Sequence, residues 1–176
     1  MKNLKLTILL LATALLFIAS CDKNKNELPV EFKFRLLDTL GNEKTEFNQG
    51  ENIIFSFLVI NKNSEDLMLE NFLPNNDFFR IYQPNTSEGT LNYGLPYDAI
   101  CEISYFTIPA NDILELKCPW VSSDNSSYYY NCLLTNKELH ETFIPVGNFY
   151  TNFMQSFKIK DVQTEEKQFK INFTVK

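Results

Sequence analysis

From residue 30 onward, apolar and polar residues alternate over short stretches, which is the pattern of half-buried β-strands. Residues 30–38 show the alternation most clearly, with Val30, Phe32, Phe34 and Leu36 on one side of the predicted strand. Residues 52–61 are apolar on both faces, which predicts a central strand that is covered from both sides. The same pattern predicts turns at 38–42 and 61–66, short strands at 67–70 and 78–83, a long irregular loop at 84–98, and strands at 148–160 and 168–175.

Two segments on either side of Pro109-Ala110 allow a pairing register to be predicted as well. If residues 100–107 and 112–118 form a hairpin, apolar residues meet apolar residues and opposite charges meet each other. The opposed pairs on this register are Cys101 with Cys118, Ile103 with Leu116, Tyr105 with Leu114, Phe106 with Ile113, and Glu102 with Lys117. A shift of one residue would lose all of these matches.

Composition agrees with a strand-rich chain, because 16 phenylalanines and 8 tyrosines stand against 5 glycines. The one helical signal is Thr135-Asn136-Lys137-Glu138, which fits a capping box and predicts one or two helical turns. Strands that recur about every ten residues with polar turns between them are typical of an antiparallel sandwich. We therefore predict an all-β, antiparallel immunoglobulin-like β-sandwich of about seven to nine strands.

Residues 1–20 differ from the rest of the chain. Two lysines precede an apolar run that is too short to cross a membrane, and small residues follow it, as in a secretory signal peptide. The exit Ile18-Ala19-Ser20-Cys21 resembles the lipobox of bacterial lipoproteins. The resemblance implies cleavage before Cys21, acylation of its thiol, and membrane lipid as a partner in the bacterial cell envelope. The expected organisation is a signal peptide at 1–20, a lipidated flexible tether at 21–29, and one domain at 30–176, in the outer membrane or on the cell surface rather than in the inner membrane.

Two segments also resemble immunoglobulin-like domains. Residues 47–63 match an opening in which Gly50-Glu51 is followed by alternating apolar residues and then Asn61, as in domains of the bacterial intracellular proteinase inhibitor type. Residues 143–151 resemble the Pro-Gly-x-Tyr corner of such folds, although Val146 is inserted and Phe149 stands where the family has Tyr. The resemblance implies the fold, and it makes a proteinase inhibitor the second functional hypothesis.

The charge and the chemistry of the chain exclude several functions. With 16 Lys+Arg against 22 Asp+Glu, the chain lacks the basic surface that nucleic-acid binding needs. His140 is the single histidine, so sites that need two histidines are impossible within this chain. No calcium-loop spacing and no nucleophile elbow occur, and Asn75-Asn76-Asp77 is typical of a turn. We expect no metal, no cofactor and no enzymatic activity, with a small carboxylate-based envelope enzyme as the third hypothesis.

Two side-chain groups remain as candidate sites. In an oxidising compartment the predicted register favours a Cys101–Cys118 disulfide, with a Cys118–Cys132 bridge or free thiols as alternatives. Trp120 precedes a Ser- and Asn-rich segment that carries Tyr128, Tyr129 and Tyr130, and these aromatic residues could bind a ligand. The alternative is that Trp120 and some of the tyrosines fill the core. The leading hypothesis is a lipid-anchored, non-catalytic domain that binds a protein or glycan.

Overall fold

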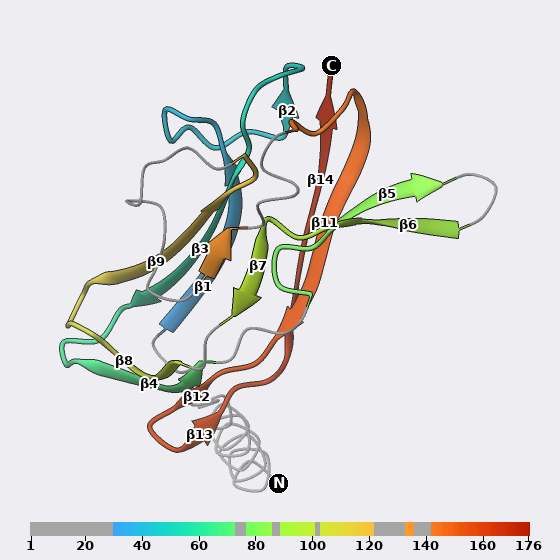
Figure 1. The fold of residues 1–176 in the computed structure, drawn as a ribbon. Helices are drawn as coiled ribbons and strands as arrows, with labels where there is room; N and C mark the ends of the chain where they lie inside the picture. Colours follow the sequence, from blue (N-terminus) through green and yellow to red (C-terminus); the bar gives the residue numbers. More distant parts are fainter. Residues whose placement is uncertain (1–29, 73–76, 86–88, 101–102, 122–132, 136–141) are drawn as a thin grey trace, which may run out of the picture.

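The computed structural model describes residues 30–72, 77–85, 89–100, 103–121, 133–135 and 142–176. Within these ranges all regular structure is β-strand, and the strands are arranged as packed antiparallel sheets (Figure 1). The prediction of an all-β, immunoglobulin-like sandwich is confirmed, but the expected seven to nine strands are too few. The described residues form 14 strands, because short pairings such as β2, β12 and β13, of two residues each, add to the longer strands.

The first sheet has three antiparallel strands in the order β1-β3-β9, formed by Val30–Leu37, Ile54–Asn61 and Ile113–Pro119. The predicted central strand is confirmed: β3 pairs with β1 along one edge and with β9 along the other. Seven of its eight residues are buried, which explains why its sequence is apolar on both faces.

The second sheet has the order β2-β14-β11-β5-β6. Its strands are β2 (Glu46–Phe47), β14 (Lys167–Val175), β11 (Gly147–Gln155), β5 (Ile81–Asn85) and β6 (Gly89–Gly94). In this sheet β2 pairs in parallel with β14, and the other pairings are antiparallel. Because β1 belongs to the first sheet and β2 to the second, the chain passes from one sheet to the other between these two strands. The expected irregular loop at 84–98 is wrong, because β5 and β6 pair there as a hairpin that projects from the body (Figure 1).

Two smaller sheets complete the fold. One has the order β13-β12-β4-β8, formed by Val162–Gln163, Lys158–Ile159, Leu67–Phe72 and Ile103–Ile108. The other pairs β7 (Tyr97–Ile100) with β10 (Leu133–Thr135). The strand predicted at 148–160 is therefore broken, since β11 ends at Gln155 and β12 begins a separate pairing with β4.

The core between the two main sheets consists largely of phenylalanine rings. Phe57 of β3 lies 6.0 Å from Phe153 of β11 and 5.0 Å from Phe169 of β14, measured between ring centroids. Phe78 and Phe79 fill the space beside them, with centroids 4.1 Å apart. Because both sheets contribute rings to one buried cluster, the chain forms a single hydrophobic core.

The hairpin predicted between residues 100–107 and 112–118 is wrong. β8 pairs with β4, whereas β9 pairs with β3, so the two strands belong to different sheets. Leu116 lies opposite Phe57 and Cys118 lies opposite Phe55. The turn between β8 and β9 therefore connects two different sheets. The apolar residues of each strand pair with apolar residues of β3 or β4 instead of with each other.

Asn61 holds this connection in place. Its side chain is buried, and its amide nitrogen donates to the carbonyl oxygens of Glu65 at 2.9 Å, Ile108 at 3.1 Å and Pro109 at 2.9 Å. Its amide oxygen accepts from the backbone nitrogen of Asn63 at 2.9 Å. One side chain thus ties the loop after β3 to the loop before β9.

The other residues that carry the family resemblance also have structural roles. Gly50 has a φ of 80°, a left-handed conformation that glycine adopts without steric cost. The Glu51 carboxylate accepts from the backbone of Asn48 at 2.9 Å and pairs with Lys44 at 2.7 Å. A Cβ on Gly147 would lie 3.2 Å from the ring of Phe149, so glycine lets that ring pack against the backbone.

Candidate ligand-binding face

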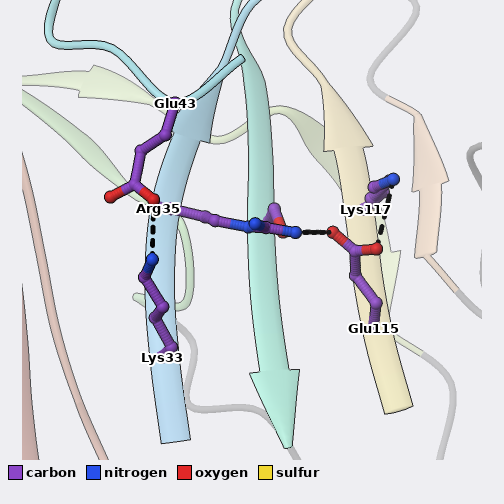
Figure 2. A network of polar contacts seen from close by, with 6 residues as sticks. Lys33, Arg35, Glu43, Glu115 and Lys117 are labelled. Carbon is purple, nitrogen blue, oxygen red and sulfur yellow. Dashed lines mark hydrogen bonds and ion pairs between the residues drawn. The ribbon is translucent and has the colours of Figure 1, made fainter. Parts of the chain in front are cut away.

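The outer face of the first sheet carries a network of charges that satisfy one another (Figure 2). Arg35 on β1 reaches across β3 to the Glu115 carboxylate at 2.8 Å and donates to the Ser56 hydroxyl at 3.1 Å. Ser56 donates to the same carboxylate at 2.5 Å, and Lys117 pairs with its second oxygen at 3.1 Å. We call this surface the charged face.

The pKa of Glu115 shows how closely the network is matched. Burial acts to raise that pKa, but hydrogen bonds from Ser56, Arg35 and Lys117 outweigh it and hold the pKa below its ordinary value. Lys33, two residues before Arg35 on β1, pairs with Glu43 at 2.7 Å (Figure 2). Every cation named here already has a carboxylate partner, so a charged ligand would have to break an existing ion pair to bind to the charged face.

The outer face of the second sheet is different in kind. A single row of opposed residues crosses four strands, from Asn92 on β6 through Tyr82 on β5 and Tyr150 on β11 to Asn172 on β14. We call this surface the tyrosine face. We define it by outward side chains of β5, β6, β11 and β14, namely Tyr82, Asn92, Asn148, Tyr150, Asn152, Met154, Gln168, Lys170, Asn172 and Thr174. Glu46 on β2 lies opposite Thr174, at the border of this face.

The two tyrosines of the row are ordered by each other. Their ring centroids lie 5.1 Å apart with an interplanar angle of 18°, and the Lys170 ammonium lies 4.8 Å from the Tyr150 centroid. Partial burial raises the pKa of Tyr82, and the nearby Asp77 carboxylate acts in the same direction. Because the rings stack on one another, the pair presents ring edges rather than two open ring faces to a ligand.

Hydrogen bonds also fix several of the amide side chains on this face. Gln168 donates to Asn152 at 2.8 Å, and Thr174 donates to Asn148 at 2.9 Å. Arg80, which pairs with Asp77 at 2.6 Å, donates to the Asn92 oxygen at 3.1 Å. A ligand would therefore meet a surface whose side chains are already held in place, which lowers the entropy lost on binding.

Trp120, which the sequence offered as a ligand-binding residue, is not exposed. Its side chain is 1% accessible, its ring lies near those of Phe55 and Tyr93, and its indole nitrogen donates to the Thr142 carbonyl at 3.1 Å. The prediction that Trp120 binds a ligand is wrong, and the alternative that it fills the core is right. Burial removes the large apolar ring from water, and the bond to Thr142 satisfies the indole N–H.

Cys118 is likewise a core residue. It is fully buried as a free thiol, and its sulfur lies 3.3 Å from the carbonyl oxygen of Pro96. Burial raises the pKa of this thiol, so the reactive thiolate is strongly disfavoured. The hairpin register that supported a Cys101–Cys118 bridge is wrong, since Phe55 occupies the position opposite Cys118.

Several other predicted sites lie outside the described residues. These are Cys21, Cys101, Cys132, the helical turn after Thr135, His140, and the tyrosines Tyr128, Tyr129 and Tyr130. In the part of the chain that is described, no helix is long and apolar enough to cross a membrane. The same part contains no cluster of three or more His, Cys, Asp or Glu side chains suited to a metal ion.

Sequence reasoning missed the tyrosine face because its row joins residues that are far apart in the chain. Tyr82 and Tyr150 are 68 positions apart, and only the pairing of β5 with β11 brings them together. A partial signal exists in the strand predicted at 148–160, whose alternate residues Asn148, Tyr150, Asn152 and Met154 include no acid. In so acidic a chain, an outward row without a carboxylate is a feature that could have been noticed.

Comparisons with known proteins give no family. No protein-family model matches the chain, and a search of curated proteins found no match. Among solved structures, the chain is similar to PapD-like (ASH) domain 7 of human CEP192, with 8% identity and a TM-score of 0.41. The alignment covers 89% of this chain and 92% of that domain.

Proposed function

We propose that this protein is a lipid-anchored, non-catalytic binding module of the bacterial cell envelope, and that it binds a protein or glycan through the tyrosine face. The observation that carries the proposal is the row Asn92–Tyr82–Tyr150–Asn172, which crosses four strands and has two stacked tyrosines at its centre. Tyrosines surrounded by asparagine side chains are a composition that known binding surfaces favour.

The anchoring part of the proposal rests on the lipobox-like Ile18-Ala19-Ser20-Cys21. Residues 21–29 would connect the lipid to β1, and fully extended they would span about 30 Å. Val30 lies beside Asn61, near the β4 and β12 end of the sandwich, whereas the C-terminus lies at the opposite end beside β2 (Figure 1). β11 and β14 run between the two ends (Figure 1), so a tether that joins the domain at Val30 would attach at one end of the sandwich and not at the middle of these strands.

The resemblance to proteinase inhibitor domains does not add a second candidate function. Gly50, Glu51 and Asn61, which carry that resemblance, are used to shape turns and to join loops. These roles explain why an immunoglobulin-like domain keeps such residues, and they point to no protease.

The anchor is tested by Cys21→Ser in the full precursor. We expect mass spectrometry of the wild-type protein to find an acyl group at Cys21, and we expect the wild type to enter the detergent phase of a phase separation. The variant should stay aqueous or remain uncleaved, because acyl chains supply the membrane affinity. A variant that still entered the detergent phase would refute anchoring through Cys21.

The ligand surface is tested by photo-crosslinking in the cells that make the protein. A benzophenone amino acid replaces Asn172, which is exposed on the tyrosine face. In a control variant it replaces Ile113, which is 51% exposed and begins β9 two residues before Glu115 of the charged face. We expect a crosslinked adduct, protein or glycan, from position 172 and none of the same mass from position 113. Equal adducts from both positions, or none from position 172, would refute the tyrosine face as the binding surface.

A further inference from the structure

We propose that the ligand of the tyrosine face is a polysaccharide that carries carboxylate groups, with Lys170 as the residue that binds a carboxylate. This inference rests on the proposed function and specifies its ligand. It follows from the placement of an ammonium without a carboxylate partner, two stacked tyrosines and a set of amide side chains on one face whose neighbouring acids, Glu46 and Asp77, are already paired with cations.

The charge on the tyrosine face is the opposite of what the whole chain would suggest. The chain has 22 acidic residues and 16 basic ones, yet the outward side chains of β5, β6, β11 and β14 that define this face include no carboxylate. Two acids lie at its borders: Glu46 on β2 is opposite Thr174, and Asp77 precedes β5. Both border acids already have a cationic partner, since Glu46 pairs with Lys176 at 2.7 Å and Asp77 pairs with Arg80 at 2.6 Å. Lys170 is therefore the charge of this face that has no carboxylate partner among the described residues. An anionic ligand is therefore attracted to this surface, whereas it would be repelled from most of an acidic protein.

Lys170 also lacks a counter-charge of its own. On the charged face, Arg35 and Lys117 share the Glu115 carboxylate, and Lys33 pairs with Glu43. Among the described residues Lys170 has no such partner, and its ammonium rests over the ring of Tyr150 at 4.8 Å. A cation–π contact at an exposed site is weak, so a ligand carboxylate can compete for this ammonium with a charge-assisted hydrogen bond.

The rest of the face favours a sugar over a protein. The buried centre of a protein interface is typically apolar, but Met154 is the single aliphatic side chain in the set that defines the tyrosine face. Apart from Lys170, the other members are tyrosine, asparagine, glutamine and threonine, whose side chains can both donate and accept hydrogen bonds. Sugar hydroxyls do the same, so a chain of sugar rings laid across the row could pair with one amide after another.

Asn172 is placed to assist Lys170. It lies opposite Tyr150 in the β11–β14 pairing, two residues along β14 from Lys170 on the same face. Its side chain makes no hydrogen bond within the described part of the chain, in contrast to Asn152, which accepts from Gln168. A carboxylate held by Lys170 would place neighbouring hydroxyl groups of the same sugar within reach of this amide.

The test measures binding of the full mature, lipidated protein in detergent to three probes by isothermal titration calorimetry. The probes are polygalacturonate, which carries carboxylates, dextran, which is a neutral polysaccharide, and polyglutamate, which is an anionic polypeptide. The test variant is Lys170→Gln, and the matched control is Lys33→Gln, which removes the same charge from the other sheet.

We expect polygalacturonate to bind and dextran and polyglutamate not to bind. Lys170→Gln should weaken that binding about tenfold, as expected for loss of one charge-assisted contact, while Lys33→Gln should change it less than about twofold. Added salt should weaken wild-type binding more than it weakens binding of Lys170→Gln.

The other outcomes overturn the inference in separate ways. Equal binding of dextran would show a glycan site without selection for charge, and the proposed function would stand. Binding of polyglutamate without polygalacturonate would replace the glycan with an acidic protein partner. Equal effects of the two lysine variants would remove Lys170 from the site. No binding of any probe would also refute the carboxylate polysaccharide, and the proposed function would then depend on the crosslinking result at position 172.

Discussion

Replacement of Asn61 by alanine should destabilise the fold more than any other single change to a polar side chain on the first sheet. The Asn61 amide donates to the carbonyls of Glu65, Ile108 and Pro109 and accepts from Asn63, and it is 1% accessible. Alanine removes the donors and the acceptor together and leaves the buried Ile108 carbonyl without this partner. Water cannot easily replace the amide at that position.

The magnitude follows from the four hydrogen bonds. A typical intramolecular hydrogen bond contributes about 1 kcal/mol net, and a buried group left without a partner costs about 1–3 kcal/mol. Because two amide hydrogens are shared among three carbonyls, the bonds are not independent, and we expect a total loss of about 3 kcal/mol. That is a large part of the 5–15 kcal/mol, roughly, by which a domain is stable.

The assay is urea unfolding followed by the fluorescence of Trp120. Trp120 is the single tryptophan and is fully buried, so its emission reports on the core without further labelling. With a slope of about 2 kcal/mol per molar urea, the midpoint should fall by roughly 1.5 M while the slope stays unchanged. Asn172→Ala on the exposed tyrosine face is the matched control and should change the free energy of unfolding by less than about 0.5 kcal/mol.

A second substitution separates hydrogen bonding from loss of volume. Asn61→Asp keeps the shape of the side chain and can still accept from Asn63, but a carboxylate cannot donate to the three carbonyls. It should therefore be at least as destabilising as Asn61→Ala. A loss below about 1 kcal/mol for Asn61→Ala, or wild-type stability for Asn61→Asp, would show that the amide does not hold the two loops together.

Three further predictions concern buried or paired groups. Cys118 should resist a maleimide reagent in the native protein and react in urea, because burial excludes the reagent and disfavours the thiolate; equal rates in both states would contradict its placement. Trp120→Ala should lower the free energy of unfolding by about 3–5 kcal/mol, because it leaves a cavity in the core and removes the hydrogen bond to Thr142. Urea unfolding followed by circular dichroism measures this loss, and a loss below about 1 kcal/mol would place the indole outside the core. The Glu115 pKa is lower in the folded state than its ordinary 4.5, so the stability that comes from its pairing with Arg35 is present above pH 4.5 and is lost as the pH falls below it. The urea midpoint of the wild type should therefore fall on acidification, and the midpoint of Glu115→Gln should fall less. An equal fall in both proteins would refute this role of Glu115.

The sequence alone was sufficient to predict the fold class and most of the strands. Alternation with a period of two predicted β1 and β14, and an apolar run predicted the central position of β3. These predictions hold because alternation is a local property: it shows which residues of a strand face the core, whatever the neighbouring strand is. The boundaries were less accurate where a strand broke, as between β11 and β12.

The choice of strand partner could not be read from the same pattern. The proposed pairing of Leu116 with Ile103 matched apolar residues well, but Leu116 lies opposite Phe57 instead, an equally good match. In a chain with many alternating strands, one apolar row fits another almost equally well, so complementarity between two segments does not select between partners. The contacts of Asn61 with Ile108 and Pro109 join two loops at the point where β8 and β9 separate.

The candidate site depends on this non-local choice. The predicted strands at 78–83, 148–160 and 168–175 contain Tyr82, Tyr150 and Lys170, but no local rule places Tyr82 against Tyr150 or Lys170 over the Tyr150 ring. Conversely, the polar segment after Trp120 favoured an exposed position for this residue, but in the structure the packing of the sheets buries it. The sequence thus determined which residues form strands and which way they face, because backbone sterics and burial act locally. The tertiary structure decided which faces meet and which residues become neighbours, because those contacts depend on the whole chain closing around one core.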